Sequence, residues 1–125
     1  MILDTKALSA WWTGEPAAAA LLATARTLFV PVPAIVEFRY GVLQSHLRDP
    51  LTRWMEEALG ATTILGIDSD TARHCAEIRL ALRQSGTPIP TNDLWIAALA
   101  RQHHLPVASR DAHFDHVKDI TRVAW

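Results

Sequence analysis

The chain has 125 residues, of which 50% are hydrophobic and 20% are charged, and its formal net charge is −1. This length fits a single domain over residues 1–125, and the hydrophobic content excludes an intrinsically disordered chain. The single cysteine, Cys75, excludes an intrachain disulfide framework and a multi-cysteine zinc site. Charged residues interrupt every long apolar run, so we expect no signal peptide and no membrane span, and we predict a cytoplasmic protein.

The first half of the chain alternates short apolar runs with helical patterns. It predicts, in chain order, a buried strand at Met1–Asp4, helices at Ala7–Trp12 and Glu15–Arg26, a strand at Thr27–Val30, and a helix from Pro33 to about His46. Pro33 suits the first turn of that last helix, because a helix needs no hydrogen bond from its first N–H groups.

The second half continues the alternation. It predicts a helix from Asp49 to about Leu59, a strand at Thr62–Leu65, a long helix at Asp68–Ser85, a helix that begins at Thr91, and strands at Leu105–Ala108 and Ile120–Val123. The segment Leu94–Ala100 is apolar on almost every side, so its helix should be buried. Strands that alternate with helices favour an α/β protein with three layers, α/β/α, around a central parallel sheet of four to five strands.

Four acidic residues stand where such a sheet would bring them together. Asp4 follows the first strand and Asp111 follows the strand Leu105–Ala108, while Glu37 and Asp93 lie in the first turns of two helices. Ligands bind beyond the carboxyl ends of parallel strands, which is the edge that these positions share. Each acid alone is explained equally well as a helix cap or a solvated charge, but their common location favours one acidic site.

Carboxylates this close repel one another unless a cation lies between them. Mg²⁺ and Mn²⁺ prefer oxygen ligands, so a divalent cation is the expected partner of the cluster. Asp115 would be a fifth member if the residues after Asp111 turn helically. His113 and His116 flank the expected site, where a surface or structural role is the simpler expectation.

Four segments in this order resemble the PIN domain family, and within it the VapC-like toxin ribonucleases of type II toxin–antitoxin pairs. They are Met1-Ile-Leu-Asp4-Thr5, the segment around Glu37 that ends at Gly41, Asn92-Asp93 with the apolar run to Ala98, and Ala108-Ser-Arg-Asp111 with its continuation to Phe114. The resemblance covers nearly the whole chain and implies a PIN-like three-layer fold.

The resemblance implies a Mg²⁺- or Mn²⁺-dependent endoribonuclease that hydrolyses RNA phosphodiester bonds. The family's four catalytic acids match Asp4, Glu37, Asp93 and Asp111, and the expected metal ligands among them are Asp4, Asp93 and Asp111. Thr5 and Ser109 match supporting hydroxyl positions, and Asp115 matches a variable acidic one. Arg39 and Arg110 are candidates for contacts with RNA phosphate, although each is also explained as a surface or ion-paired arginine.

The resemblance also implies a cognate VapB-like antitoxin. An acidic cleft would accept an arginine or lysine from that partner. We further expect a homodimer built by the helices that carry Trp11, Trp12 and Trp54, because exposed apolar patches usually mark interfaces.

Lys6 departs from the family pattern, in which asparagine usually follows Asp-Thr. If the extended strand continues past Asp4, Lys6 lies on the same face as Asp4 and competes with a metal for the cluster. If the chain turns at Thr5, the lysine carries its charge into solvent.

Two other classes of function compete with the ribonuclease. A catalytically degenerate PIN module would bind RNA or protein as a scaffold, and Lys6 is the feature that favours it. A phosphotransfer domain fits less well. A dehalogenase-like phosphatase needs an aspartate at position 6, and a receiver domain needs one directly after its third strand.

Overall fold

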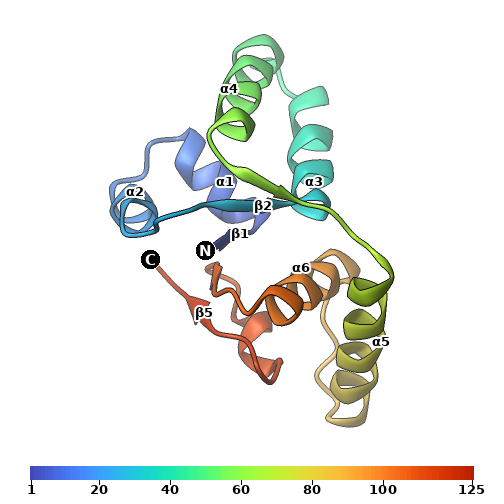
Figure 1. The fold of residues 1–125 in the computed structure, drawn as a ribbon. Coiled ribbons are helices and arrows are strands. Elements are labelled where there is room, and N and C mark those ends of the chain that lie inside the picture. Colours follow the sequence, from blue (N-terminus) through green and yellow to red (C-terminus); the bar gives the residue numbers. More distant parts are fainter.

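The structure is a computed structural model that describes residues 1–125, and a five-stranded sheet runs through its centre (Figure 1). The strands are β1 (Ile2–Leu3), β2 (Phe29–Pro31), β3 (Thr63–Leu65), β4 (Val107–Ala108) and β5 (Arg122–Val123). Their order in the sheet is β3-β2-β1-β4-β5, and every neighbouring pair is parallel. The first strand therefore lies in the middle, between β2 and β4, so the chain order reverses at this strand.

Six α-helices and one short 3₁₀-helix surround the sheet. They are α1 (Thr5–Trp12), α2 (Pro16–Ala23), α3 (Val32–Leu43), α4 (Arg48–Gly60), α5 (Ser69–Gln84), α6 (Thr91–His103) and the 3₁₀-helix η1 (Ala112–His116). Helix α1 packs against α2 and α3, α3 packs against α4, and α5 packs against α6. The α/β class and the parallel sheet predicted from the sequence are confirmed.

The ends of several elements differ from the prediction by a few residues. Helix α3 stops at Leu43, short of His46, because the chain turns at Ser45, whose hydroxyl accepts a hydrogen bond from the backbone N–H of Leu47. Helix α2 begins at Pro16 and ends at Ala23, followed by Thr24, whose hydroxyl donates to the carbonyl of Leu21.

The core consists of 26 buried hydrophobic residues contributed by both sides of the sheet. Helix α6 is the most deeply buried helix, as its uniformly apolar segment predicted, and Ile96–Ala100 are inaccessible or nearly so. The strands β1 and β4 are fully buried, so the positions directly after them are held by a rigid scaffold. No helix is both long and apolar enough to cross a membrane.

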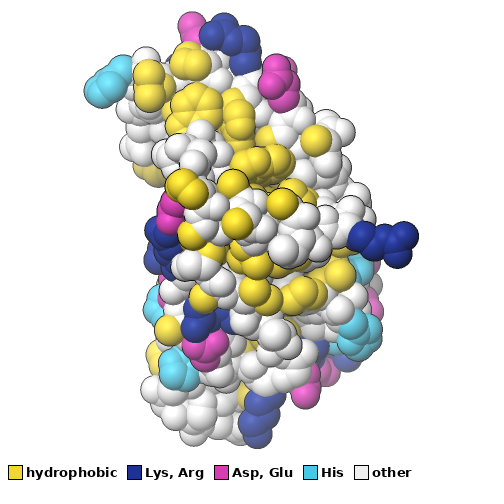
Figure 2. Space-filling view, turned by 90° about the vertical axis from the view of Figure 1, so that its left-hand side faces the viewer, with side chains coloured by type: hydrophobic (Ala, Val, Ile, Leu, Met, Phe, Trp, Pro, Cys, Tyr) yellow, Lys and Arg dark blue, Asp and Glu magenta, His cyan; other side chains and the backbone are white.

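The three tryptophans of α1 and α4 pack against one another. The ring of Trp54 lies 5.4 Å from Trp11 and 5.7 Å from Trp12 between centroids, and 5.6 Å from Phe38 of α3. All three tryptophans are half-buried. Figure 2 shows hydrophobic side chains gathered over the upper part of one face and across its middle. The tryptophans therefore join α1, α3 and α4 within one chain and also leave apolar surface exposed.

The outer side of α3 carries a second apolar surface. Its large exposed side chains recur at helical spacing, at Val32, Val36, Tyr40 and Leu43, and Leu47 continues the row beyond the helix end. We call these five residues the α3 stripe. Nothing in the chain covers them.

Candidate active site

The four acids predicted from the sequence reach the same edge of the sheet. Asp4 directly follows β1 and Asp111 lies three residues beyond β4. Glu37 lies in the second turn of α3, which leaves the carboxyl end of β2. Asp93 lies in the first turn of α6, and a helix that leads back into a parallel strand starts at the carboxyl edge. The topology thus brings the acids of four segments together where the strand order reverses.

Asp4 is a buried carboxylate, only 4% exposed, that also caps α1. Its Oδ1 accepts a hydrogen bond of 2.7 Å from the backbone N–H of Ala7, and its Oδ2 accepts one from the hydroxyl of Ser109. Burial raises the pKa of Asp4, these two hydrogen bonds oppose the increase, and the nearby Asp93 adds to it. The carboxyl group is therefore fixed in direction by donors from two distant segments.

Ser109 connects the first and the fourth strand at the site. Its buried hydroxyl donates to Asp4 and accepts a hydrogen bond of 2.9 Å from the backbone N–H of Asp111. The sequence predicted a supporting role for this hydroxyl, and these contacts are of that kind.

Glu37 is held by two neighbours at the rim of the site. Its Oε2 accepts a hydrogen bond of 2.5 Å from the hydroxyl of Thr5, and its Oε1 accepts one of 2.7 Å from the side-chain amide of Asn92. Thr5 thus supports an acid of the cluster, as its position suggested. Glu37 is exposed, so its carboxylate faces the solvent side of the cluster.

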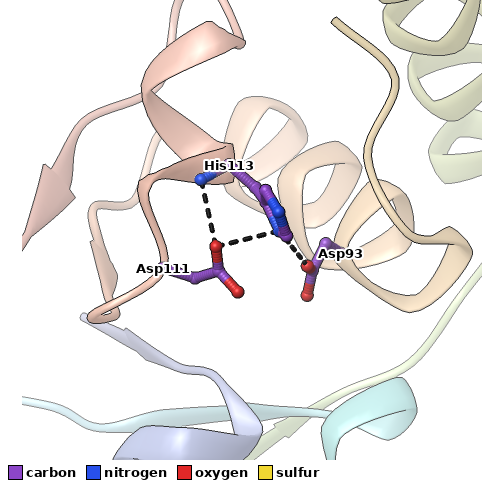
Figure 3. A group of neighbouring side chains, drawn as sticks. All are labelled: Asp93, Asp111 and His113. Carbon is purple, nitrogen blue, oxygen red and sulfur yellow. Dashed lines mark hydrogen bonds and ion pairs between the residues drawn. The ribbon is translucent and has the colours of Figure 1, made fainter.

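Asp93 and Asp111 converge on the imidazole of His113 (Figure 3). The Nδ1 atom lies 3.2 Å from Oδ2 of Asp93 and 2.8 Å from Oδ1 of Asp111. The backbone N–H of His113 also donates to Oδ1 of Asp111, at 3.1 Å. One atom of each of these three side chains falls within 4.8 Å of the others, close enough for a shared metal ion.

The pKa values of Asp93 and Asp111 move in opposite directions. Partial burial raises the pKa of Asp93, and repulsion from Asp111 and Glu37 adds to this, while His113 opposes it. Burial also disfavours the charged form of Asp111, but hydrogen bonds from the His113 N–H and from Lys6 lower its pKa overall. At neutral pH the site therefore presents ionised Asp111 next to the more easily protonated Asp93.

Lys6 lies in the site although the chain does turn at Thr5. The helix α1 begins at Thr5, so the extended strand does not continue to Lys6. The side chain nevertheless reaches Asp111, and Nζ lies 3.3 Å from its Oδ2. The lysine side chain is 61% exposed, so it covers the rim of the cluster rather than its floor.

Three residues proposed from the sequence lie apart from the cluster. Asp115 does stand on a helical turn, η1, but Arg122 of β5 holds its two oxygens at 2.8 and 2.7 Å. Arg110 forms an ion pair with Glu15 and stacks on Trp125, with 4.9 Å from its guanidinium carbon to the ring centroid. Arg39 is exposed on α3 and has no ion-pair partner.

Two residues of the site were not singled out by sequence reasoning for the roles that they occupy. Asn92 was treated as part of a helix start, yet it orients Glu37. For His113 the sequence favours a surface or structural role, and in the structure its ring lies between two acids. The available signal for both was their sequence position, directly before Asp93 and two residues after Asp111.

Comparison with known proteins places this chain in a family. The model of the PIN domain family matches residues 1–120, and the chain belongs to this family. Ribonuclease VapC5 of Mycobacterium tuberculosis is 33% identical over 115 residues, which cover 90% of this chain and 84% of that protein. The VapC ribonuclease Y4jK of Sinorhizobium fredii is 29% identical over 121 residues, which cover 89% of this chain and 86% of that one.

Solved structures show the same fold. One is the structure of VapBC2 from Rickettsia felis, bound to a DNA fragment from the promoter. It superposes with a TM-score of 0.88 at 22% identity, over 99% of this chain and 97% of that one. The toxin–antitoxin complex VapBC-5 from Mycobacterium tuberculosis superposes with a TM-score of 0.69 at 29% identity, over 98% of this chain and 97% of that one.

The residues of the site fit a divalent cation. Asp93, Asp111 and His113 offer ligand atoms within 4.8 Å of one another, and the buried carboxyl group of Asp4 is coupled electrostatically to Asp93. A cation between these carboxylates would offset both their mutual repulsion and the burial that raises the pKa values of Asp4 and Asp93.

Proposed function

We propose that the protein is a metal-dependent endoribonuclease and the toxin component of a VapBC-like toxin–antitoxin pair. The observation that carries the proposal is the convergence of Asp4, Asp93 and Asp111 from three distant segments on one edge of the sheet. The membership in the PIN domain family and the VapC ribonucleases among the relatives support it.

The residues have separate tasks in this proposal. Asp93 and Asp111 would hold Mg²⁺ or Mn²⁺, and Asp4, whose orientation is fixed by Ser109, would contribute a further carboxylate directly or through water. The cation, when bound, activates water for attack on a phosphodiester and offsets the charge that develops on the phosphate. Glu37, fixed by Thr5 and Asn92, faces solvent and orients the attacking water.

Cleavage of RNA by purified protein tests the proposal. We expect cleavage with Mg²⁺ or Mn²⁺ and none with a chelator. Asp4→Asn and Asp93→Asn should each lower the rate by more than about 100-fold while the fold is kept, because each removes a charge that holds the cation. Asp70→Asn is the matched control, because Asp70 is an exposed acid that pairs with Arg73 on α5 and makes no contact with the cluster. Wild-type rates in both cluster variants would refute the proposal.

One contact favours the alternative of a degenerate PIN module that acts as an RNA- or protein-binding scaffold. The Lys6 ammonium lies 3.3 Å from Asp111 and supplies a positive charge to the cluster without any metal. The same cleavage assay separates the two functions, since a scaffold binds RNA and leaves it intact at every metal concentration.

We also propose a VapB-like antitoxin as partner. A groove of about 390 Å³ opens between α1, α3 and the start of α4, and its lining includes Thr5, Glu37 and apolar side chains such as Trp12 and Leu51. This groove suits a peptide that places apolar residues in it and a basic residue against Glu37. The test is whether a small protein encoded next to this gene inhibits RNA cleavage, and whether replacement of its basic residue abolishes the inhibition.

The remaining proposals are an action on RNA in the cytoplasm and a homodimer. The sequence assigns the dimer to α1 and α4, which carry Trp11, Trp12 and Trp54, and the exposed α3 stripe is a second candidate surface for it. Fractionation of cells that express a tagged chain tests the compartment, and the dimer is treated in the Discussion.

A further inference from the structure

His113 occupies a position between the two acids that the proposed function gives to the metal. Its Nδ1 lies 2.8 Å from Oδ1 of Asp111 and 3.2 Å from Oδ2 of Asp93, and Figure 3 shows the ring placed between the two carboxyl groups. The side chain is 44% exposed, whereas those of Asp93 and Asp111 are 17% and 18% exposed. The inner edge of the imidazole thus meets the cluster and much of the ring meets water.

The position of this ring is built into the fold. Asp111 caps η1 through the backbone N–H of His113, which fixes the start of this short helix. The next residue, Phe114, is 1% exposed and anchors the helix in the core. With its backbone held on one side by a cap and on the other by a buried ring, His113 is directed towards Asp93 across the gap between η1 and α6.

We propose that Nδ1 of His113 is a direct ligand of the divalent cation, together with one oxygen each of Asp93 and Asp111, and that this nitrogen makes the site prefer Mn²⁺ over Mg²⁺. This inference rests on the proposed metal site. Neighbouring ligand atoms around an octahedral ion bound at about 2.1 Å are about 3.0 Å apart. The separations of 2.8 and 3.2 Å between Nδ1 and the two carboxylate oxygens bracket that value.

Without a metal, Nδ1 lies within hydrogen-bond distance of both carboxylates. To ligate a cation, Nδ1 would have to be free of hydrogen, with the hydrogen of the neutral ring on Nε2. Ligand atoms of the three side chains already lie within 4.8 Å of one another, so small side-chain rotations would bring them around one ion.

A nitrogen ligand changes which ion binds best. Both Mg²⁺ and Mn²⁺ prefer oxygen ligands, but Mn²⁺ is the softer, first-row transition ion and tolerates an imidazole nitrogen in its ligand set better than Mg²⁺ does. A site made only of Asp4, Asp93 and Asp111 would present oxygen alone. The addition of His113 as a nitrogen ligand would make the site bind Mn²⁺ more tightly than Mg²⁺.

The test uses the full chain, with Mn²⁺ and Mg²⁺ alone as probes and no RNA. Pulsed electron paramagnetic resonance of bound Mn²⁺ should detect coupling to an imidazole nitrogen in the wild type and none in His113→Asn. The asparagine amide can still donate a hydrogen bond to the two carboxylates, so this variant keeps a positioning role and removes only the nitrogen ligand. In calorimetry, His113→Asn should weaken Mn²⁺ binding at least about tenfold and Mg²⁺ binding less than about threefold.

His116→Asn is the control, because it changes an exposed histidine of the same short helix that makes no contact with the cluster. It should keep the nitrogen coupling and both affinities. The inference is overturned if the wild type shows no nitrogen coupling, or if His113→Asn binds Mn²⁺ as the wild type does. Failure of the proposed function looks different, because the nitrogen coupling would be present in a protein that cleaves no RNA.

Discussion

Asp4 combines a structural and an electrostatic role in one carboxyl group. It caps α1 through the N–H of Ala7, and it receives the hydroxyl of Ser109 while lying 4% exposed beside Asp93. Since an asparagine can also accept a hydrogen bond at a helix N-terminus, Asp4→Asn preserves the cap and removes the charge. This variant is therefore suited to separate catalysis from folding.

Lys6 supplies a second prediction at this scale. Its ammonium lies at the rim of the cluster and pairs with Asp111, so a divalent cation that binds Asp111 must compete with it. Because the pair is exposed, the competition is modest, and Lys6→Asn should tighten Mn²⁺ binding by about two- to fivefold in calorimetry. Lys118→Asn, which removes the only other lysine, controls for the overall change of charge. Equal isotherms for Lys6→Asn and the wild type would remove Lys6 from the metal site.

The raised pKa of Asp93 predicts a dependence of stability on pH. In the unfolded chain this carboxyl ionises at its ordinary pKa of 3.8, and in the folded protein burial and nearby acids raise that pKa. Ionised Asp93 therefore lowers the free energy of unfolding at pH values above the raised pKa, and this loss of stability disappears as the pH falls below 3.8. Asp93→Asn should be more stable than the wild type at neutral pH and equal to it in acid.

Thermal unfolding between about pH 3 and 8, with a chelator present, measures this difference. Asp115→Asn is a control of opposite sign, because Arg122 lowers the pKa of Asp115. That variant should be less stable than the wild type at neutral pH, and the difference should disappear as the pH falls through the lowered pKa. If Asp93→Asn lost stability at neutral pH, the electrostatic description of the cluster would be wrong.

At the scale of elements, the packing of Trp54 determines how α4 is joined to the rest of the domain. This ring contacts Trp11 and Trp12 of α1 and Phe38 of α3. Trp54→Ala should lower the free energy of unfolding by about 3 kcal/mol, the lower end for such substitutions because the ring is half-buried. Trp54→Phe should lose less than half of that in denaturant unfolding. A loss below about 1 kcal/mol for Trp54→Ala would show that the ring cluster is not what joins these helices.

The elements themselves were predictable because their signals are local. Pro33 lies in the first turn of α3, the uniformly apolar Leu94–Ala100 lies in the buried α6, and Asp68 caps α5. The meeting of Asp4, Asp93 and Asp111 followed from one rule about parallel strands. The site residues were thus found from the positions of elements, not from contacts between side chains.

The contacts that escaped prediction depend on tertiary packing. The direction of the His113 side chain depends on the burial of Phe114. A single 3₁₀ turn such as η1 is too short to produce a periodic hydrophobic pattern in the sequence, so it could not be predicted in this way. The pairing of Asp115 with Arg122 requires β5 to lie beside β4. For Lys6, the backbone follows the predicted turn at Thr5, but the length of the side chain lets it return to Asp111.

At the scale of the whole molecule, the α3 stripe predicts self-association. Tyr40 and Leu43 are 65% and 57% exposed, and such rows are rare on monomers unless they bind something. Light scattering at micromolar concentration should give the mass of a dimer for the wild type and of a monomer for Tyr40→Asp. Leu80→Asp, which changes a similarly exposed leucine on α5, should remain dimeric. A monomeric wild type would refute the dimer, and a dimeric Tyr40→Asp would assign it to another surface, such as the one formed by the tryptophans of α1 and α4.

The central position of β1 has a consequence for how this protein is made. The hydrogen bond between Asp4 and Ser109 joins residues 105 positions apart, and β4, which must pair with β1, is nearly the last strand of the chain. Ribosomes add about 5–20 residues per second, so roughly 5–20 s pass between the synthesis of these two residues. A nascent or truncated chain without β4 lacks Asp111 and His113, so the acidic site is complete only after His113 has been synthesised. A ribosome thus cannot expose a working site of this nuclease before β4 and η1 have emerged, and a partner translated alongside has that interval in which to fold.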